Sequence, residues 1–221
     1  MLKLTKQIYW DLPQNSPEWH ENRIASLGGS NIATATAKGK GGGKSSTRET
    51  LLTHFAAEIN TGFRFNKSYR SKAMDRGHEL EPQAAFLYDL KYSCGKQVQY
   101  PGLIRIHKHL HCSPDLTIGL TQDGSEPCKV GEIKCVWPNV YFQILESQRV
   151  PPVYRKQCQW NMLCCGADTC DFIVYCPEWK YGSNITVIPF GRNQKVIDEL
   201  LAGAEDFINE AYARLKNIGS I

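Results

Sequence analysis

The sequence predicts an α/β protein in which one mixed central sheet of about five strands is flanked by helices. Helical spacing of apolar residues fills most of the first 90 residues, and short β-rich runs separated by turn signals begin near residue 98. Helix and strand patterns then alternate to the end, which is typical of a sheet covered by helices. The chain has 221 residues, 42% of them hydrophobic, and no internal repeat. We therefore expect a single domain over 1–221.

Start and stop signals define the helices of the first part. Ser16 and Pro17 begin a helix because serine is a favoured N-cap and proline fits the first turn. Ser30 is expected to cap a second short helix, a capping box begins a third, and Gly62 ends it. The predicted helices span about 16–25, 30–37, 46–62 and 72–90.

Strand patterns dominate the middle of the chain. A turn signal at 122–125 predicts that the runs on either side of it pair as a hairpin. Strands are expected at about 103–106, 113–120, 129–136, 172–176 and 185–190, and helices at about 138–146, 152–165 and 196–215.

Composition and charge exclude several classes of protein. The net charge of +4 is mildly basic, so basic groups that meet a nucleic acid would have to be concentrated in one channel. No apolar run approaches the roughly 18 residues of a membrane helix, and the N-terminus lacks the unbroken apolar stretch of a signal peptide. We expect a soluble protein that is not secreted by that route.

The cysteines and histidines raise the question of a zinc site. The nine cysteines form no C-x-x-C pair, so reduced thiols in a cytosolic compartment are favoured over zinc. His107, His109 and His111 alternate, which places them on one face of a strand. An ordinary polar strand face is favoured there, since no carboxylate follows at ligand spacing.

Polar residues interrupt two strands that should be buried. Asp115 begins one predicted strand, and Glu132 and Lys134 share one face of the next. If these strands pair, Asp115 comes close to Glu132. Buried carboxylates are costly unless they bind a cation, and Mg²⁺ prefers such ligands. The alternative is a surface hairpin with an ordinary Glu/Lys face.

Three further features favour a site for charged groups. Glu81, on the long predicted helix, could supply a third carboxylate. Gln157 lies on a helix that otherwise looks buried, where an amide needs a partner. Arg23 and a helix start at Ser30 supply the ingredients of a phosphate pocket.

In order, these landmarks resemble a known family. The motifs are S-P-E-W-H-x-x-R, G-S, R-G-x-x-x-E-P, C-S-P-D, E-I-K-C and Q-x-Q, spread from about 17 to 175. Together they are similar to the phage-type exonucleases of the lambda exonuclease and YqaJ viral recombinase group, within the PD-(D/E)XK nuclease superfamily. The resemblance implies a restriction-endonuclease-like core.

The resemblance also implies a role for each matching residue. Asp115 and Glu132 would bind Mg²⁺, with Glu81 as a further metal-site acid, and Lys134 would position the water. Gln157 would be an active-site amide. The proposed 5′-phosphate pocket consists of Arg23, Ser30 and Ser113. Two ions are expected, with Mn²⁺ able to replace Mg²⁺.

By resemblance, the expected activity is 5′-to-3′ degradation of one strand of linear duplex DNA, leaving a 3′ single strand for recombination. An endonuclease of the same superfamily and a catalytically silent DNA-binding module remain alternatives. The family also implies a ring-shaped homo-trimer, a single-strand annealing protein as partner, and a phage or prophage protein in the bacterial cytoplasm.

The glycine- and lysine-rich stretch at about 38–46 predicts a flexible basic loop. Gly43, Lys44 and Ser45 match the end of a P-loop, but residue 38 is lysine where that motif needs glycine, and no strand precedes it. A nucleotide triphosphatase is therefore disfavoured. A DNA-contacting loop and a solvated linker are the remaining interpretations.

Overall fold

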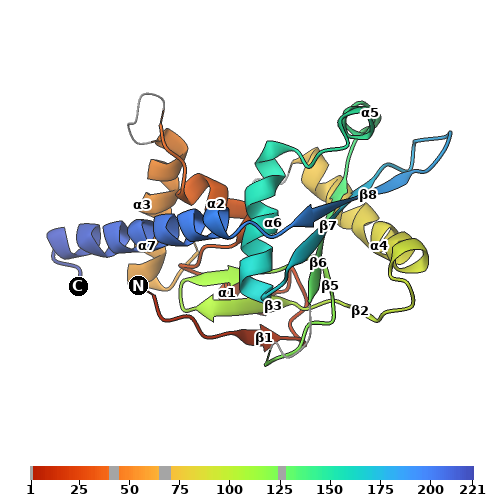
Figure 1. The fold of residues 1–221 in the computed structure, drawn as a ribbon. Coiled ribbons are helices and arrows are strands. Elements are labelled where there is room, and N and C mark those ends of the chain that lie inside the picture. Colours follow the sequence, from red (N-terminus) through yellow and green to blue (C-terminus); the bar gives the residue numbers. More distant parts are fainter. Residues whose placement is uncertain (1, 40–44, 65–70, 124–127) are drawn as a thin grey trace.

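The structure is a computed structural model that describes residues 2–39, 45–64, 71–123 and 128–221 (Figure 1). Its centre is a five-stranded mixed sheet in the order β2-β5-β6-β7-β8, flanked by helices, which confirms the predicted fold class. The strands are β2 (Val98–Gln99), β5 (Leu116–Ile118), β6 (Lys129–Cys135), β7 (Thr169–Tyr175) and β8 (Ile185–Gly191).

Strand β6 lies in the middle of this sheet and has a different neighbour on each side. It pairs antiparallel with β5, where Leu116 faces Gly131, and parallel with β7, where Glu132 faces Phe172. Parallel neighbours need a crossover connection. Helices α5 (Pro138–Ser147) and α6 (Pro152–Cys165) supply it.

A second, three-stranded sheet was not predicted. It has the order β1-β3-β4, with β1 (Gln7–Tyr9), β3 (Leu103–His107) and β4 (Leu110–Cys112) all antiparallel. The prediction that His107, His109 and His111 share one strand face is wrong, because a hairpin turn separates β3 from β4. His109 and His111 are buried, so they do not form a polar surface either.

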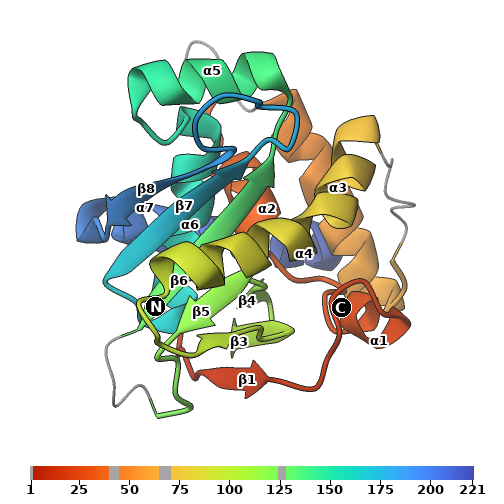
Figure 2. The ribbon, with the colours of Figure 1, turned by 90° about the vertical axis from the view of Figure 1, so that its right-hand side faces the viewer.

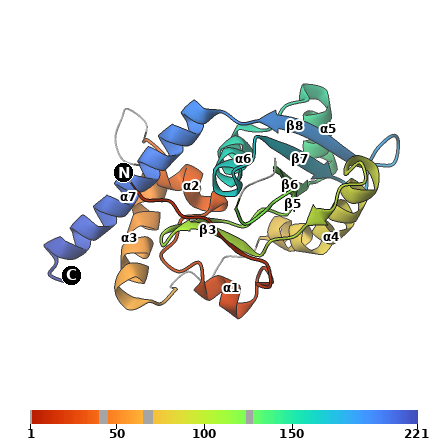
Figure 3. The ribbon, with the colours of Figure 1, turned by 60° about the horizontal axis from the view of Figure 1, so that its bottom comes forward.

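Helices cover both faces of the five-stranded sheet (Figures 2 and 3). Helix α4 (Lys72–Tyr92) packs Ala84, Ala85 and Tyr88 against one face, where Ile133 and Ile173 project. On the other face, α6 is part of the larger core, together with α2 (Gly29–Ala35), α3 (Ser46–Thr61) and α7 (Gln194–Asn217).

Three predicted helix starts and ends are corrected. Helix α1 is Pro17–Glu21, with Ser16 as N-cap, and ends before residue 25. Ser30 is not the cap of α2, because Gly28 holds that position and its N–H donates to Asn31 Oδ1 at 2.7 Å. Ser46 is the first residue of α3 rather than its cap. Gly62 ends α3 as predicted, at a φ of 62° that favours glycine.

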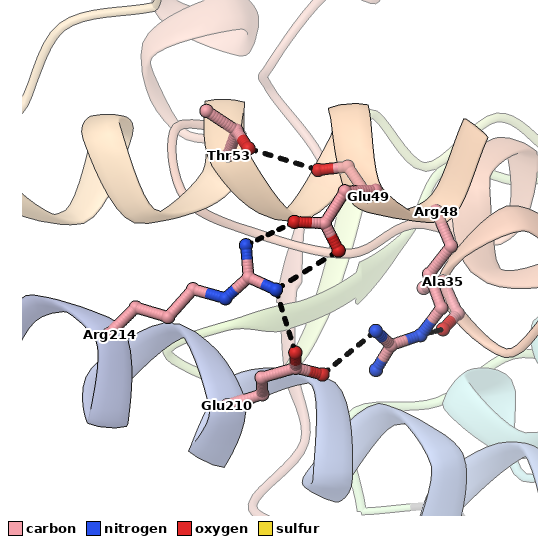
Figure 4. A network of polar contacts seen from close by, with 6 residues as sticks. All are labelled: Ala35, Arg48, Glu49, Thr53, Glu210 and Arg214. Atoms are coloured by element: carbon pink, nitrogen blue, oxygen red, sulfur yellow. Dashed lines mark hydrogen bonds and ion pairs between the residues drawn. The ribbon is translucent and has the colours of Figure 1, made fainter. Parts of the chain in front are cut away.

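An ionic network joins α3 to α7 (Figure 4). Arg214 pairs with Glu49 and with Glu210, and Glu210 Oε2 lies 2.8 Å from Arg48 Nη1. Arg48 Nε also donates to the carbonyl of Ala35, the last residue of α2, at 3.0 Å. The network therefore fixes one end of α2, whose other end forms part of the site described below.

Two further findings concern the character of the chain. The cysteines are free thiols, and all but Cys94 and Cys135 are buried. Removal from water raises the pKa of the buried Cys128 and of the half-buried Cys135 to about 12, so these thiols stay protonated. Within the described ranges, no helix has both the length and the apolar character to cross a membrane. The 124–125 part of the predicted turn and the 40–44 part of the predicted basic loop, including the P-loop-like Gly43 and Lys44, lie outside the described residues.

Candidate active site

Strand pairing brings the three residues of the central motif together. Glu132 and Lys134 point to the same side of β6 and form an ion pair. Asp115 lies just before β5, and its Oδ2 accepts a hydrogen bond from the N–H of Ile133 at 2.5 Å. Asp115 is therefore held directly beside Glu132, as the hairpin pattern predicted.

Two amides of α6 hold the Glu132 carboxylate, which is only 1% exposed. Gln157 Nε2 donates to its Oε1 at 2.6 Å, and Asn161 Nδ2 donates to its Oε2 at 2.9 Å. The amides are one helical turn apart, so one face of α6 presents both donors. Glu132 is thus fixed in orientation by groups from a second element.

The electrostatics of this cluster show an excess of acid. Burial and the charge of Glu132 raise the pKa of the Asp115 carboxyl well above its usual range. Burial also raises the pKa of Glu81, while Lys134 acts in the opposite direction. Burial opposes a charge on Lys134, but Glu132 and Asp115 outweigh it and its pKa is raised. One lysine therefore faces three carboxyl groups.

A large cavity of about 1040 Å³ opens beside these acids. Glu81 reaches it from α4, and Asp115 reaches it from the start of β5. We call it the large cavity, and its lining also includes Trp10, Asp11, Gln14, Trp19, His78, Tyr100 and Gly102.

The donor set fits a hard divalent cation. In the described part of the chain, no three His, Cys, Asp or Glu side chains lie close enough to enclose a metal by themselves. Mg²⁺ does not need such a cage, since it is commonly bound by one or two carboxylates together with waters and substrate oxygens. Asp115 and Glu132 provide two carboxylates, and the raised pKa of Asp115 indicates that a cation would relieve their repulsion.

A small pocket of about 160 Å³ lies next to the acids and brings the predicted phosphate-binding residues together. This small pocket is lined by Arg23, Ser30 and Ser113, along with Trp19, His111 and Gln157. Gln157 also bonds Glu132, so the two parts of the site share a side chain. Among the described residues that line the small pocket there is no Asp or Glu, which suits an anion.

Arg23 is the cation of the small pocket. Its Cζ lies 3.8 Å from the ring centroid of Trp19, and its Nε donates to His111 Nε2 at 2.9 Å. Burial and the nearby charge of Arg64 lower the pKa of Arg23 to about 10, so the guanidinium is still charged at neutral pH. Because Nε is engaged, the two terminal nitrogens are the ones available for a bidentate contact with an anion.

His111, Asn161 and Trp19 are site residues that the sequence analysis missed. His111 Nε2 accepts from Arg23, so Nδ1 carries the proton and donates to Ser26 Oγ at 2.7 Å. Burial and the charge of Arg23 hold the His111 pKa well below its usual value. Trp19 Nε1 donates to Ser113 Oγ at 3.1 Å. The alternating histidines were the only signal for His111, and they pointed to a strand face.

The glycines before Ser30 allow α2 to approach the site closely. A Cβ on Gly28 would lie 2.6 Å from His111 Nε2, and one on Gly29 would lie 2.7 Å from Asn161 Oδ1. Both distances are shorter than real Cβ contacts. These two glycines bring the exposed Ser30 to the mouth of the small pocket.

The fold is similar to that of solved alkaline and phage-related exonucleases. An alkaline exonuclease (LHK-Exo) from Laribacter hongkongensis is similar at a TM-score of 0.77 and 24% identity, over 92% of this chain and 96% of that one. The structure of the same enzyme in complex with dAMP is similar at a TM-score of 0.76 and 25% identity, over 92% of this chain and 96% of that one. A phage related exonuclease from Haemophilus somnus 129PT is similar at a TM-score of 0.59 and 14% identity, over 86% of this chain and 96% of that one.

The family follows from the sequence itself. Residues 18–168 match the model of the YqaJ-like viral recombinase domain, which is more than half of the chain. This chain therefore belongs to the YqaJ-like viral recombinase family, as its motifs indicated. No curated protein matches it.

Proposed function

We propose that this chain is a Mg²⁺-dependent DNA exonuclease that degrades the 5′-ended strand of linear duplex DNA and leaves a 3′ single strand for phage-type recombination. The observation that carries the proposal is the direct contact between an acid cluster and an acid-free, arginine-containing pocket. Gln157 belongs to both. The family and the exonuclease fold support hydrolysis of a nucleic acid backbone.

Asp115 and Glu132 would hold the metal, with Glu81 as a further acid on the side of the large cavity. When bound, Mg²⁺ supplies charge stabilisation for the phosphodiester and lowers the pKa of the attacking water, and a second ion would assist the leaving oxygen. Gln157 and Asn161 keep Glu132 in one orientation, so the site is organised before DNA binds.

Lys134 has the role of positioning the attacking water. Its Nζ lies beside Glu132 and 5.3 Å from the centroid of the Tyr154 ring, which restricts the position of the ammonium group. The raised pKa of Lys134 keeps it charged, so it acts as a hydrogen-bond donor and electrostatic guide rather than as a base.

The small pocket supports the proposed preference for DNA ends. Arg23, Ser30 and Ser113 would bind the terminal 5′-phosphate, which carries more charge than an internal phosphodiester. The solved complex of LHK-Exo with dAMP shows that a protein of this fold binds a mononucleotide. An internal cutter would have no use for an anion pocket beside its acids.

The test is digestion of linear and closed circular duplex DNA with and without Mg²⁺. Linear DNA should be degraded to single strands only when Mg²⁺ is present, and closed circles should survive. Efficient linearisation of circles would favour the endonuclease alternative. Binding of DNA ends without any hydrolysis under Mg²⁺ or Mn²⁺ would favour the silent module.

We also propose the remaining family properties for this chain: a ring-shaped homo-trimer, cooperation with a single-strand annealing protein, and action in the cytoplasm of a bacterial host. Light scattering of the purified protein would measure its mass in solution. A monomer at working concentration would contradict the ring.

A further inference from the structure

The large cavity and the small pocket adjoin each other and differ in charge. Both are lined by Gln14 and Trp19, so they share a wall. The small pocket contains Arg23 and no acid among its described residues. The large cavity contains Asp11, Glu81 and Asp115, and no lysine or arginine is found among the described residues lining it. A phosphate group suits the first space and is repelled from the second.

Two exposed aromatic side chains line the large cavity. Trp10 is 41% exposed and Tyr100 is 55% exposed, although large aromatic rings usually bury their faces. Trp10 follows β1 directly, and Tyr100 follows β2. Neither belongs to the core of the fold, so their rings are available to a ligand in the cavity.

The backbone around these rings is tightly held. Gly102 N donates to Tyr9 O at 3.0 Å, which brings the segments that carry Trp10 and Tyr100 together. A Cβ on Gly102 would lie 1.7 Å from Leu12 O, so only glycine permits this approach. Gln14 Nε2 donates to Pro114 O at 3.2 Å, which ties the same segment to the residue before Asp115. The aromatic wall is therefore in fixed register with the acids.

Resting on the proposed function, we infer that the large cavity binds the nucleobase of the 5′-terminal nucleotide, with Trp10 and Tyr100 as its stacking surfaces. That nucleotide has its 5′-phosphate in the small pocket and its 3′-phosphate, the scissile one, at Asp115 and Glu132. Its base must then enter the space that adjoins both. A neutral, flat and sequence-variable group matches a cavity with aromatic walls and with no lysine or arginine among the described residues that line it.

The role assigned to Trp10 and Tyr100 is to position the substrate and not to take part in the chemistry. Every base has a π-face, so stacking tolerates any sequence, as digestion along duplexes of any sequence requires. Stacking on an aromatic side chain contributes roughly five- to a hundredfold in affinity per base. Loss of stacking should therefore give a measurable drop in affinity even when the acid cluster is intact.

The experiment compares two 5′-phosphorylated linear duplexes that differ only in the terminal nucleotide, which is either adenine-bearing or abasic. For the unmodified protein, kcat/KM should be about five- to a hundredfold higher with the base present. Trp10→Ala and Tyr100→Ala should reduce this ratio toward one, while Trp10→Phe should keep most of it. Tyr181→Ala is the matched control, because Tyr181 is 88% exposed in the loop after β7 and lines neither space.

A binding measurement separates stacking from turnover. A terminal 2-aminopurine should lose fluorescence on binding in EDTA, and Trp10→Ala should restore it. Equal rates on both duplexes, or an unchanged ratio in both alanine variants, would overturn the base site while leaving the exonuclease proposal intact. Absence of Mg²⁺-dependent digestion by the unmodified protein would overturn both.

Discussion

Glu132 and Asp171 are buried carboxylates on neighbouring strands, and they are held in different ways. Glu132 projects from β6 toward α6, where Lys134, Gln157 and Asn161 contact it. Asp171 projects from β7 toward α4 and is 4% exposed. Its Oδ2 accepts from Tyr88 at 2.7 Å and from Lys129 at 3.0 Å.

The two carboxylates differ in how many other acids share their partners and in whether a cavity adjoins them. Asp171 has a lysine and a tyrosine as partners, and nothing in its described surroundings calls for a ligand. Glu132 shares its single lysine with Asp115 and Glu81, and both of these border an open cavity. A buried carboxylate with its own partners is a structural element, whereas surplus carboxylates beside a cavity indicate a cation site.

The largest effect is expected from Asp115→Ala and Glu132→Ala. Both remove a proposed metal ligand, so hydrolysis of linear DNA should fall by about a thousandfold or more. The variants should remain folded and still bind DNA ends. Single-turnover digestion at saturating Mg²⁺, with circular dichroism as the folding control, measures this. Substantial Mg²⁺-dependent activity in either folded variant would reject the site.

Arg23→Ala should give the next largest effect. Loss of a charge-assisted contact costs about 1.5–3 kcal/mol, or roughly ten- to a hundredfold in rate. The loss should appear on 5′-phosphorylated duplex and be small on 5′-hydroxyl duplex. The ratio of the two rates is the measurement. If the unmodified protein ignores the 5′-phosphate, the small pocket has another purpose.

Tyr88→Phe tests the other carboxylate. It removes one hydrogen bond to Asp171, so the free energy of unfolding should fall by about 1.5 kcal/mol and Tm by roughly 3–6 °C. Digestion below that Tm should be unchanged. A drop in kcat with unaltered stability would show that Asp171 acts in catalysis and that the contrast with Glu132 is mistaken.

The smallest effect concerns pH. The pKa of Asp115 is raised in the folded protein, so its stabilising contribution is full below the unfolded value of about 3.9 and is lost as pH rises through the folded pKa. Without Mg²⁺, the free energy of unfolding should therefore decline as pH rises from about 4 through that folded value. Asp115→Asn should flatten this part of the curve in urea titrations, and Mg²⁺ should reduce it. An identical decline in Asp115→Asn would assign it to other groups.

The sequence predicted most of the central sheet and the acid motif because their signals are local. Alternation along 129–136 places Glu132 and Lys134 on one face, and a turn signal supports pairing with the strand after Asp115. The three-stranded sheet was missed because β1 and β4 have only three residues each, too few for a periodic pattern.

The rest of the site depends on long-range packing. His111 and Arg23 are 88 positions apart and meet only because β4 and the segment after α1 are neighbours in space. Asn161 looks like one more polar residue on α6 until its contact with Glu132, 29 positions away, is known. The start of α2 differs for a local reason, since the Asn31 side chain accepts a hydrogen bond from the Gly28 N–H and Gly28, not Ser30, is the N-cap.

The ionic network of α3 and α7 bears on how this chain can be modified in the laboratory. Arg48 joins Glu210 to the carbonyl that ends α2, and a Cβ on Gly203 of α7 would lie 2.8 Å from Thr36 Cγ2, just after α2. Helix α7 therefore sets where α2 rests, and α2 carries Ser30 to the small pocket. Truncation or fusion beyond about residue 200 should therefore alter how the small pocket binds DNA ends, even though α7 contains no site residue. Affinity tags are better tolerated elsewhere.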